Sequence, residues 1–400
     1  MKKYNSILLL AACFILAGIF TGCKKDNGGG GPVISSIRAI APAPNDSTLT
    51  RAAPGQTIVI RGANLASATQ IYFNGYQSAF NSALFADNNI VVTIPADMPF
   101  ASLDQSQLNT IRVVTPEGEV TYSFPIEPPA PVVQSMTNEM AVAGERVTLF
   151  GNNFFFIDKV VFPGGIEVAT DISTNASGTT LDVTVPAGIT TGGPLEVVNR
   201  YGTGVSLLRF NDMVTGMLCN FDNVNTLNNW AGVGISSDAS LFPGNRGTFA
   251  RMTVSGIAAG DWAWYGGGRS INVEIPGTWV PVASLGESTD NWAVKFEINT
   301  RVPWKNGSLL VTKDYSWSYM HRLQPWQQSG EYTSNGWKTI VMPLSQFKTA
   351  DGTGNPPPNI EAVVGSSGTG GINIFHINAG TTVIENFDLG IDNLRVAKMK

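Results

Sequence analysis

The residues best suited to binding chemistry in this chain of 400 residues are its tryptophans, and all nine lie between Trp230 and Trp337. An indole ring has a flat, electron-rich face and few rotatable bonds, so it contacts C–H groups with little loss of side-chain freedom. Sugar rings carry C–H patches on their faces, so exposed aromatic rings at intervals would form a platform for a carbohydrate chain. A large β domain also needs bulky core residues, and most tryptophans serve that purpose.

Local sequence separates platform candidates from core candidates. Trp230 lies in a polar segment without apolar neighbours. Trp264 and Tyr265 precede three glycines, Gly266–Gly268, where an open backbone leaves rings accessible. Trp262 alternates with Trp264, so an extended segment would place these two rings on one face and Tyr265 on the other.

Trp292 and Trp337 each begin a strand of alternating apolar residues, which predicts that they lie in the core. The segment 315–322 is a second candidate surface. If it is a strand, one face carries four side chains: Tyr315, Trp317, Tyr319 and His321. That face is either a binding surface or part of the core. Trp326 is predicted to be a loop aromatic and a further stacking ring.

Catalysis on carbohydrate would need other residues. Glycoside hydrolysis usually requires two carboxylates about 5–10 Å apart, and no alternating set of acidic residues predicts such a pair. Asp388 and Asp392 are close in sequence, but Asp392 in the closing strand is better explained as structural. A lyase would need a base with basic neighbours, and His321 beside Arg322 keeps that alternative open.

Charge and composition exclude some classes of protein. The net charge is −5, from 25 basic and 30 acidic residues, so the chain lacks the basic footprint of a nucleic-acid-binding protein. Low basicity also favours a neutral glycan over a polyanionic one. The 43 glycines and 23 prolines favour turns and short strands over helix bundles.

The N-terminus is typical of an exported protein. Two lysines precede an apolar stretch, Ile7–Phe20, that is too short to span a bilayer comfortably. The sequence Phe20–Cys23 resembles the bacterial lipobox, which implies cleavage before Cys23 and acylation of that residue; an ordinary secretory cleavage site is the alternative. Residues 1–22 are then a lipoprotein signal peptide and residues 23–32 a flexible tether.

Two segments repeat at an offset of 89 residues. The matched pairs are Gly55 and Gly144, Gly62 and Gly151, and Asn64 and Asn153. Each copy continues with short strands separated by turn signals about every ten residues, which predicts a β-sandwich. The pattern resembles the IPT/TIG family of immunoglobulin-like domains, over residues 33–126 and residues 131–212.

Residues 213–400 are predicted to form a third, all-β domain without helical periodicity. Cys219–Asp222 and Ile391–Val396 resemble the first and last strands of jelly-roll carbohydrate-binding modules. The predicted fold class is therefore all-β, with two immunoglobulin-like β-sandwiches followed by a jelly-roll-like β-sandwich. Jelly-roll modules often hold a structural calcium ion near these strands, which implicates Asp222 and Asp392; turn or strand-end hydrogen bonding is the alternative for both.

A lipidated cysteine, tandem immunoglobulin-like domains and a tryptophan-rich jelly roll together resemble the surface glycan-binding lipoproteins of Bacteroidota polysaccharide-utilisation loci. The resemblance implies a non-catalytic protein, lipid-anchored in the outer membrane and facing the exterior, that captures a polysaccharide beside a porin-like importer complex. The family's glycan-contacting aromatics fall around Trp230 and Trp264. The expected carbohydrate-binding residues are Trp230, Trp264, Trp262, Tyr265, Trp317 and Trp326. A protein-binding adhesin is the remaining alternative, which nine tryptophans in one domain do not favour.

The lipid anchor is tested by the variant Cys23→Ala. Without the acylated residue, the lipoprotein peptidase should leave the signal uncleaved, and the protein should leave the membrane fraction. Cell fractionation and mass spectrometry measure both effects. Recovery of the variant in membranes at the wild-type level and with the mature mass would exclude lipidation at this position.

Overall fold

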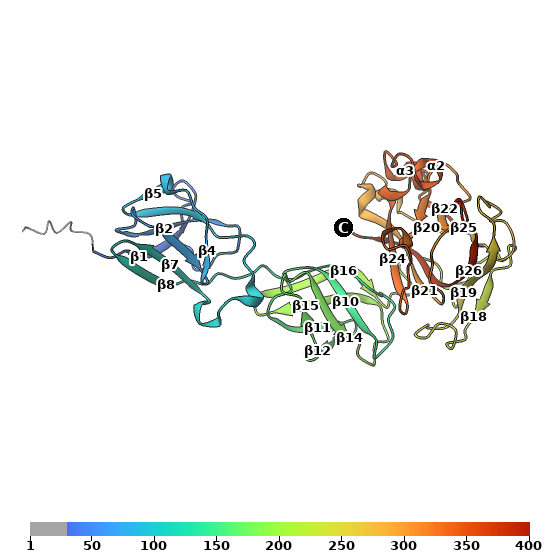
Figure 1. Ribbon diagram of the computed structural model, residues 1–400, viewed down its shortest axis with the longest axis horizontal. Coiled ribbons are helices and arrows are strands. Elements are labelled where there is room, and N and C mark those ends of the chain that lie inside the picture. The colour runs from blue at the N-terminus through green and yellow to red at the C-terminus, as the bar shows by residue number, and fades with distance from the viewer. Residues whose placement is uncertain (1–29) are drawn as a thin grey trace, which may run out of the picture. The chain divides into compact units, whose positions relative to one another are not determined.

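The structure is a computed structural model that describes residues 30–400, so the predicted signal peptide and Cys23 lie outside the described part. The chain divides into two compact units, one ending at Pro128 and the other running from Pro129 to Lys400 (Figure 1). Both units are built from β-sheets, which confirms the predicted all-β class. None of the helices within residues 30–400 is long and apolar enough to cross a membrane.

The first unit is a β-sandwich of two four-stranded antiparallel sheets. One sheet has the order β1 (Val33–Ala39), β2 (Thr57–Ala63), β6 (Asn89–Thr93) and β5 (Phe85–Ala86). The other has the order β4 (Tyr76–Gln77), β3 (Gln70–Phe73), β7 (Thr110–Thr115) and β8 (Gly118–Ser123). Alternate side chains of these strands, such as Ile58 and Ile60, are fully buried between the sheets.

The Gly-x-Asn element of the repeat ends strand β2 where it approaches β1. A Cβ atom at Gly62 would lie 1.7 Å from the carbonyl oxygen of Val33, so only glycine permits this approach. Asn64 then adopts a left-handed conformation with a φ of 58°. Its side-chain amide donates to the carbonyl of Gly31 at 3.1 Å. The motif thus fixes the point at which the chain leaves the sheet.

The second unit begins with a sandwich that repeats this arrangement. One of its sheets has the order β13 (Ser173–Thr174), β14 (Thr180–Thr184), β10 (Arg146–Asn152) and β9 (Val132–Met136). The other has the order β12 (Ile166–Val168), β11 (Ile157–Phe162), β15 (Gly193–Asn199) and β16 (Gly202–Phe210). A Cβ atom at Gly151 would lie 1.8 Å from the carbonyl oxygen of Val132. Asn153, with a φ of 61°, donates its amide to Ala130 at 3.3 Å. Equivalent residues make equivalent contacts, so the predicted repeat is confirmed.

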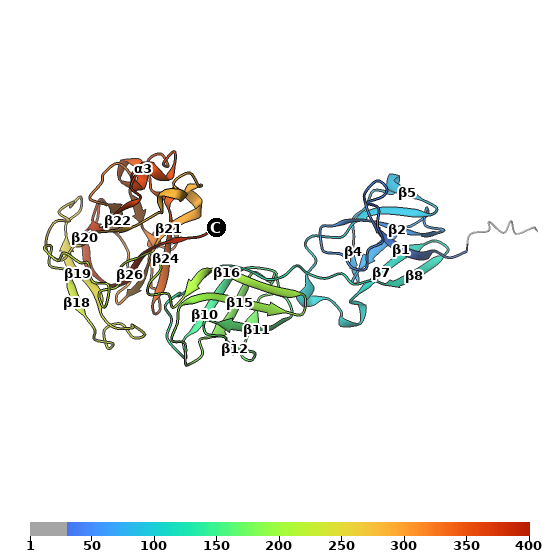
Figure 2. The same cartoon turned by 180° about the vertical axis from the view of Figure 1, so that it is seen from behind.

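The C-terminal part of the second unit is a sandwich of two further sheets (Figures 1 and 2). One has the order β18 (Gly234–Ser236), β19 (Phe249–Ile257), β26 (Ile384–Lys398), β21 (Trp292–Thr300) and β24 (Lys338–Pro343), with β17 (Met217–Cys219) also paired to β26. The other has the order β20 (Ser270–Thr278), β25 (Thr369–Ile377), β22 (Ser308–Lys313) and β23 (His321–Leu323). The opening and closing segments identified in the sequence therefore pair directly.

Helical structure within residues 30–400 consists of short turns. The α-helical turns are α2 (Thr349–Gly352) and α3 (Ile360–Val364). The 3-10 turns are η1 (Ser82–Leu84), η2 (Phe100–Ser102), η3 (Gln105–Gln107), η4 (Val282–Ser284), η5 (Thr289–Asn291), η6 (Pro325–Gln328) and η7 (Leu344–Gln346). These turns connect the strands, and the β-sheets form the framework of the structure.

Alternation along β25 gives its two faces different surroundings. Ile372 and Ile374 face the core between the two C-terminal sheets, here called the main core, whereas Phe375 faces away from it. His376 shares the core face and stacks on Phe387 with 4.1 Å between ring centroids. Burial lowers the pKa of His376 to about 3, so this ring is a neutral packing residue at physiological pH.

Two tryptophan predictions concern buried positions: Trp292 lies in the main core, whereas Trp337 packs in a separate cluster with Phe242 and Phe249. Trp292 is 9% exposed and Trp337 is 3% exposed, which confirms that both are buried. Trp279 and Trp304 are also buried, each 1% exposed. Four of the nine tryptophans therefore serve packing, and their side chains are unavailable for a surface platform.

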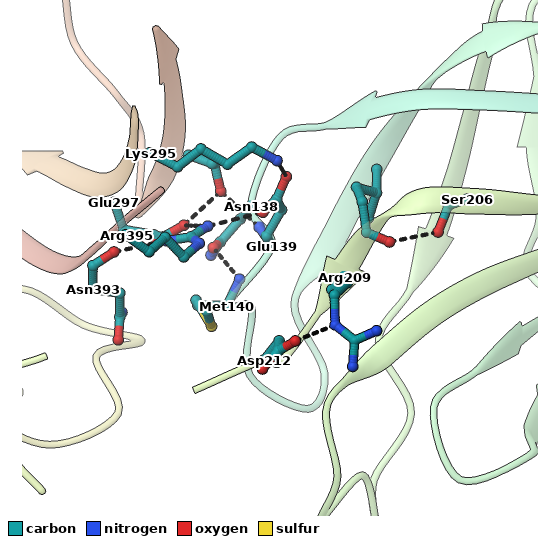
Figure 3. Close-up of polar contacts among 12 residues, drawn as sticks. Asn138, Glu139, Met140, Ser206, Arg209, Asp212, Lys295, Glu297, Asn393 and Arg395 are labelled. Atoms are coloured by element: carbon teal, nitrogen blue, oxygen red, sulfur yellow. Dashed lines mark hydrogen bonds and ion pairs between the residues drawn. The ribbon is translucent and has the colours of Figure 1, made fainter. Parts of the chain in front are cut away.

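A buried cluster of four charges joins the second sandwich to the C-terminal sheets (Figure 3). Glu139, in the segment after β9, accepts hydrogen bonds from Lys295 at 2.6 Å and from Arg395 at 2.9 Å. Arg395 also donates two hydrogen bonds to Glu297, at 2.8 and 2.9 Å. The four side chains are only 1–3% exposed. Two anions and two cations thus neutralise one another at a site with little exposure to solvent.

Contacts around this cluster complete the joint. Burial opposes ionisation of Glu139, but Lys295 and Arg395 outweigh it and hold the pKa of the Glu139 carboxyl below its ordinary value. The backbone amide of Glu139 donates to the Thr339 hydroxyl at 2.7 Å, and the Thr339 amide donates to the Thr137 carbonyl at 2.9 Å. The predicted domains 131–212 and 213–400 therefore lie in one compact unit, and the boundary between them stays a prediction.

We expect Glu139→Gln to destabilise the second unit by about 3–5 kcal/mol, because it leaves two buried cations with one buried anion. Urea unfolding followed by tryptophan fluorescence measures this unit alone, since every tryptophan lies within it. The control is Glu331→Gln, which breaks the exposed pair of Glu331 with Lys305 and should change stability by less than about 1 kcal/mol. Equal midpoints for the two variants would contradict a structural role for the cluster.

Candidate functional site

The outer face of the sheet formed by β20, β25, β22 and β23 carries an apolar patch. The patch consists of Leu310, Met320, Phe375 and Ile377. Solvent-facing sides of antiparallel sheets are usually polar, so such a patch needs a cover. Trp264 and Tyr315 pack against it and provide that cover.

Phe375 is the base on which the aromatic rings are arranged. The ring of Trp264 stacks on it with 4.2 Å between centroids and 28° between planes. Tyr315 and Trp317 lie nearly parallel to Phe375, with centroid distances of 6.1 and 6.0 Å and interplanar angles of 20° and 21°. One buried phenylalanine therefore orients three rings contributed by two separate loops.

Trp230 and Tyr265 extend this aromatic surface. Trp264 contacts both rings edge-on, Trp230 at 6.2 Å and Tyr265 at 6.0 Å. Trp230 is 47% exposed, Tyr265 64% and Trp317 44%, whereas Trp264 is half-buried. Rings that are held on one side and open on the other are suited to stacking on the C–H faces of sugars. We call Trp230, Trp264, Tyr265, Tyr315 and Trp317 the platform.

Trp262 would share a face with Trp264 in an extended segment, but the segment is not extended. Among the ring contacts of residues 30–400, none joins Trp262 to the platform, and its carbohydrate-binding role stays a prediction. The Trp264 amide donates to the carbonyl of Trp262 at 2.8 Å, which makes the segment a turn. The carboxylate of Asp261 favours this turn by accepting a hydrogen bond from the Ala263 amide at 2.7 Å. Trp262 is 37% exposed, and the guanidinium carbon of Arg322 lies 5.9 Å from its ring centroid.

The second candidate segment, residues 315–322, is not a single strand, so its four side chains do not share one face. Asp314 and Tyr315 adopt left-handed conformations, with φ angles of 47° and 57°, and a turn follows β22. Tyr315 and Trp317 therefore join the platform. Tyr319 instead packs against the main core, and His321 lies against the buried ring of a core phenylalanine.

Trp326 lies apart from the other site candidates. It occupies the 3-10 turn η6, its ring packs against the main core, and its indole donates to the carbonyl of Gly307 at 2.8 Å. Among the ring contacts of residues 30–400, none joins Trp326 to the platform. The sequence placed this tryptophan in a turn but did not show that its ring is partly covered.

The residues considered for catalysis, His321, Asp388 and Asp392, lie in surroundings that do not favour this role. The Nε2 atom of His321 lies 3.2 Å from the side-chain oxygen of Gln346, and burial lowers the pKa of His321 to about 4. A histidine with this pKa is a weak base near pH 7. Asp388 forms a salt bridge with Arg251 at 2.6 Å, and Asp392 is buried at 4% exposure.

Asp222 and Asp392, the two candidate calcium ligands, lie close enough to interact electrostatically. Burial, together with the neighbouring charge of Glu297 and that of Asp222, raises the pKa of Asp392 to about 8. The side-chain oxygens of Asn245 and Asn393 are buried without a hydrogen-bond partner, and both residues line the same small cavity as Asp392. Such hard oxygen atoms fit a calcium ion. Within residues 30–400, however, no group of three or more His, Cys, Asp or Glu residues is arranged for a metal.

Two known protein families match parts of this chain. Residues 210–398 match the family described as the surface glycan-binding protein B xyloglucan binding domain, and residues 32–126 match the IPT/TIG domain family. The platform lies entirely within the first of these matches. The IPT/TIG match coincides with the first sandwich.

Two individual proteins illustrate the likeness. The crystal structure of a surface glycan-binding protein from Prevotella bryantii superposes with a TM-score of 0.69, covers 93% of this chain and 99% of that chain, and is 22% identical, so it shows the shared fold. An IPT/TIG domain-containing protein of Bacteroides ovatus is 26% identical over 209 residues, 49% of this chain. The match spans only 43% of that relative's length. The C-terminal part of the chain thus matches the surface glycan-binding protein B family and its first sandwich the IPT/TIG family, in agreement with the sequence resemblance.

Proposed function

We propose that this protein captures a polysaccharide non-catalytically at the cell surface. The single observation that carries the proposal is the platform, in which exposed rings surround a half-buried Trp264 stacked on Phe375. Rings already oriented by a base lose little further freedom when a sugar chain docks. The family description of residues 210–398 supports the same conclusion and makes xyloglucan the first glycan to test.

The charges around the platform favour a neutral glycan. Lys313 and Asp314 form an ion pair with each other. The guanidinium of Arg322 donates to the Asp351 carbonyl at 2.8 Å and to the Ser308 hydroxyl at 3.2 Å. Both of these acceptors are neutral, so Arg322 keeps its positive charge, and the Glu274 carboxylate, which accepts hydrogen bonds from Trp230 and Tyr315, supplies a negative one. Charges of both signs near the platform favour a neutral glycan over a polyanion. An outer-membrane lipid anchor and a porin-like importer complete the proposal, on the sequence resemblance alone.

A surface hydrolase or lyase is the second candidate, and the structure offers it less support. His321 lies against the core, and Asp388 is held by Arg251. Incubation with a polysaccharide panel separates the two functions, because a binding protein retains the glycan and releases no reducing ends. Release that grows with time and protein concentration would favour the enzyme.

The platform is tested by Trp230→Ala in the full mature chain. The lost stacking should weaken glycan affinity by about 2 kcal/mol, or roughly thirtyfold. The melting temperature should change little, because Trp230 is 47% exposed. Trp264→Ala should lose affinity and also some stability, since it uncovers Phe375.

Trp292→Ala is the matched control for these variants. Removal of this buried ring should lower the free energy of unfolding by about 3–5 kcal/mol and leave the glycan affinity of the folded protein unchanged. Calorimetric titration with xyloglucan and thermal unfolding on the same samples separate the two effects. Normal binding by both Trp230→Ala and Trp264→Ala would place the stacking surface elsewhere.

We also propose a structural calcium ion beside Asp222 and Asp392, as the jelly-roll resemblance suggests. The buried side-chain oxygens of Asn245 and Asn393, which have no hydrogen-bond partner, support this proposal. The protein should melt at a higher temperature with calcium than with chelator at pH 7.5, and Asp392→Asn should remove that difference. Identical melting curves for the wild-type protein in the two buffers would refute it.

A further inference from the structure

Glu274 connects two aromatic residues of the platform, although nothing in the sequence patterns drew attention to it. It lies on the outer face of β20, and its side chain is exposed. Its Oε1 atom accepts hydrogen bonds from the indole Nε1 of Trp230, at 3.1 Å, and from the hydroxyl of Tyr315. Its Oε2 atom accepts from the side-chain amide of Asn228. One carboxylate therefore holds side chains from two loops that are distant in sequence.

The loop that carries Trp230 is otherwise attached to the sheet through its backbone. The amide of Asn228 donates to the carbonyl of Asn272 at 2.7 Å, and Leu227 forms a β-bridge with Val273. These contacts fix the backbone of the loop, and the Trp264 ring lies edge-on to the Trp230 indole without bonding to its N–H group. The hydrogen bonds of Trp230 to Glu274 and to the Tyr315 hydroxyl, the latter at 3.2 Å, select one orientation.

The interaction with Glu274 also affects the pKa of the Tyr315 phenol. Burial and the hydrogen bond to Glu274 raise the pKa of Tyr315 to about 12. In return, the hydrogen bond from Tyr315, followed by that from Asn228, holds the pKa of Glu274 below its ordinary value. The carboxylate is therefore ionised at neutral pH, which makes it a strong acceptor for both donors.

We propose that Glu274 is a positioning residue of the platform, whose carboxylate holds the Trp230 indole and the Tyr315 phenol in the orientation that receives the sugar ring. The proposal rests on the proposed glycan-binding function. Its physical basis is preorganisation: an exposed aromatic ring that is already fixed loses less freedom on binding than one that rotates. Glu274 acts through the two rings and needs no contact with the glycan.

The experiment compares Glu274→Ala and Glu274→Gln in the full mature chain, with Glu385→Ala on β26 as the exposed acidic control from the same domain. Glu274→Ala should lose about tenfold in xyloglucan affinity, and Glu274→Gln, which keeps one acceptor oxygen, should lose less. All three variants should keep the wild-type melting temperature within a few degrees, because the carboxylate is exposed. Glu385→Ala should bind as the wild type does.

Two readouts without glycan separate positioning from a general structural effect. The indole N–H resonance of Trp230, assigned by its loss in Trp230→Ala, should shift and exchange faster with water in Glu274→Ala. The phenol of Tyr315, assigned by difference from Tyr315→Phe, should titrate closer to the ordinary tyrosine value of about 10. Glu274→Gln should give intermediate values in both measurements.

Several results would overturn the proposal. If Glu274→Ala binds glycan with wild-type affinity while Trp230→Ala binds weakly, the positioning role of Glu274 is refuted and the proposed glycan-binding function stands. Lost affinity with an unchanged Trp230 resonance and an unchanged Tyr315 titration would show that Glu274 acts other than by positioning. Normal binding by Trp230→Ala as well as Glu274→Ala would refute the platform itself, and the positioning role would fall with it.

Discussion

The second unit depends on the neutralisation of four charges that are buried together. Glu139 belongs to the second sandwich, whereas Lys295, Glu297 and Arg395 belong to the C-terminal sheets, and all are at most 3% exposed. An ionised side chain without a partner is strongly disfavoured in such surroundings. Each half of the unit therefore supplies charge that the other half requires. Strands β21 and β26, which carry the three C-terminal members, lie in the sheet opposite the one that bears the platform.

The platform depends in turn on a sheet that is apolar on both faces. Ile372 and Ile374 fill the main core, and Phe375, which directly follows Ile374, supports Trp264 on the other side of the sheet. A solvent-facing phenylalanine at that position would be unfavourable without a cover. The tryptophan that covers it is thereby held with its ring parallel to a rigid base. The same apolar contact that protects the sheet orients the binding surface.

The sequence predicted much of this structure because its signals are local. Glycine and asparagine at fixed spacing predicted the repeated sandwich, and the positive φ angles at Asn64 and Asn153 show why those residue types are needed. Loop composition predicted that the rings of Trp230 and Trp264 are accessible; Trp230 is 47% exposed, whereas Trp264 is half-buried against Phe375. The divided segment after β22 and the inward ring of Trp326 were missed, because left-handed turns and long-range packing leave no periodic trace. Phe375 had one signal, a strand whose two faces are both apolar, and Glu274 had none, since its partners come from distant loops.

The buried cluster also bears on how such chains diversify. A proline-rich segment, Pro125–Pro131, spans the boundary between the two compact units, and recombination at that boundary would keep the four buried charges in one product. Recombination near residue 212 would separate Glu139 from Lys295 and Arg395 and leave unmatched charge in both products. Insertion or loss of spacer domains is therefore expected at the first junction, with the second sandwich inherited together with the glycan-binding sheets as a single genetic module.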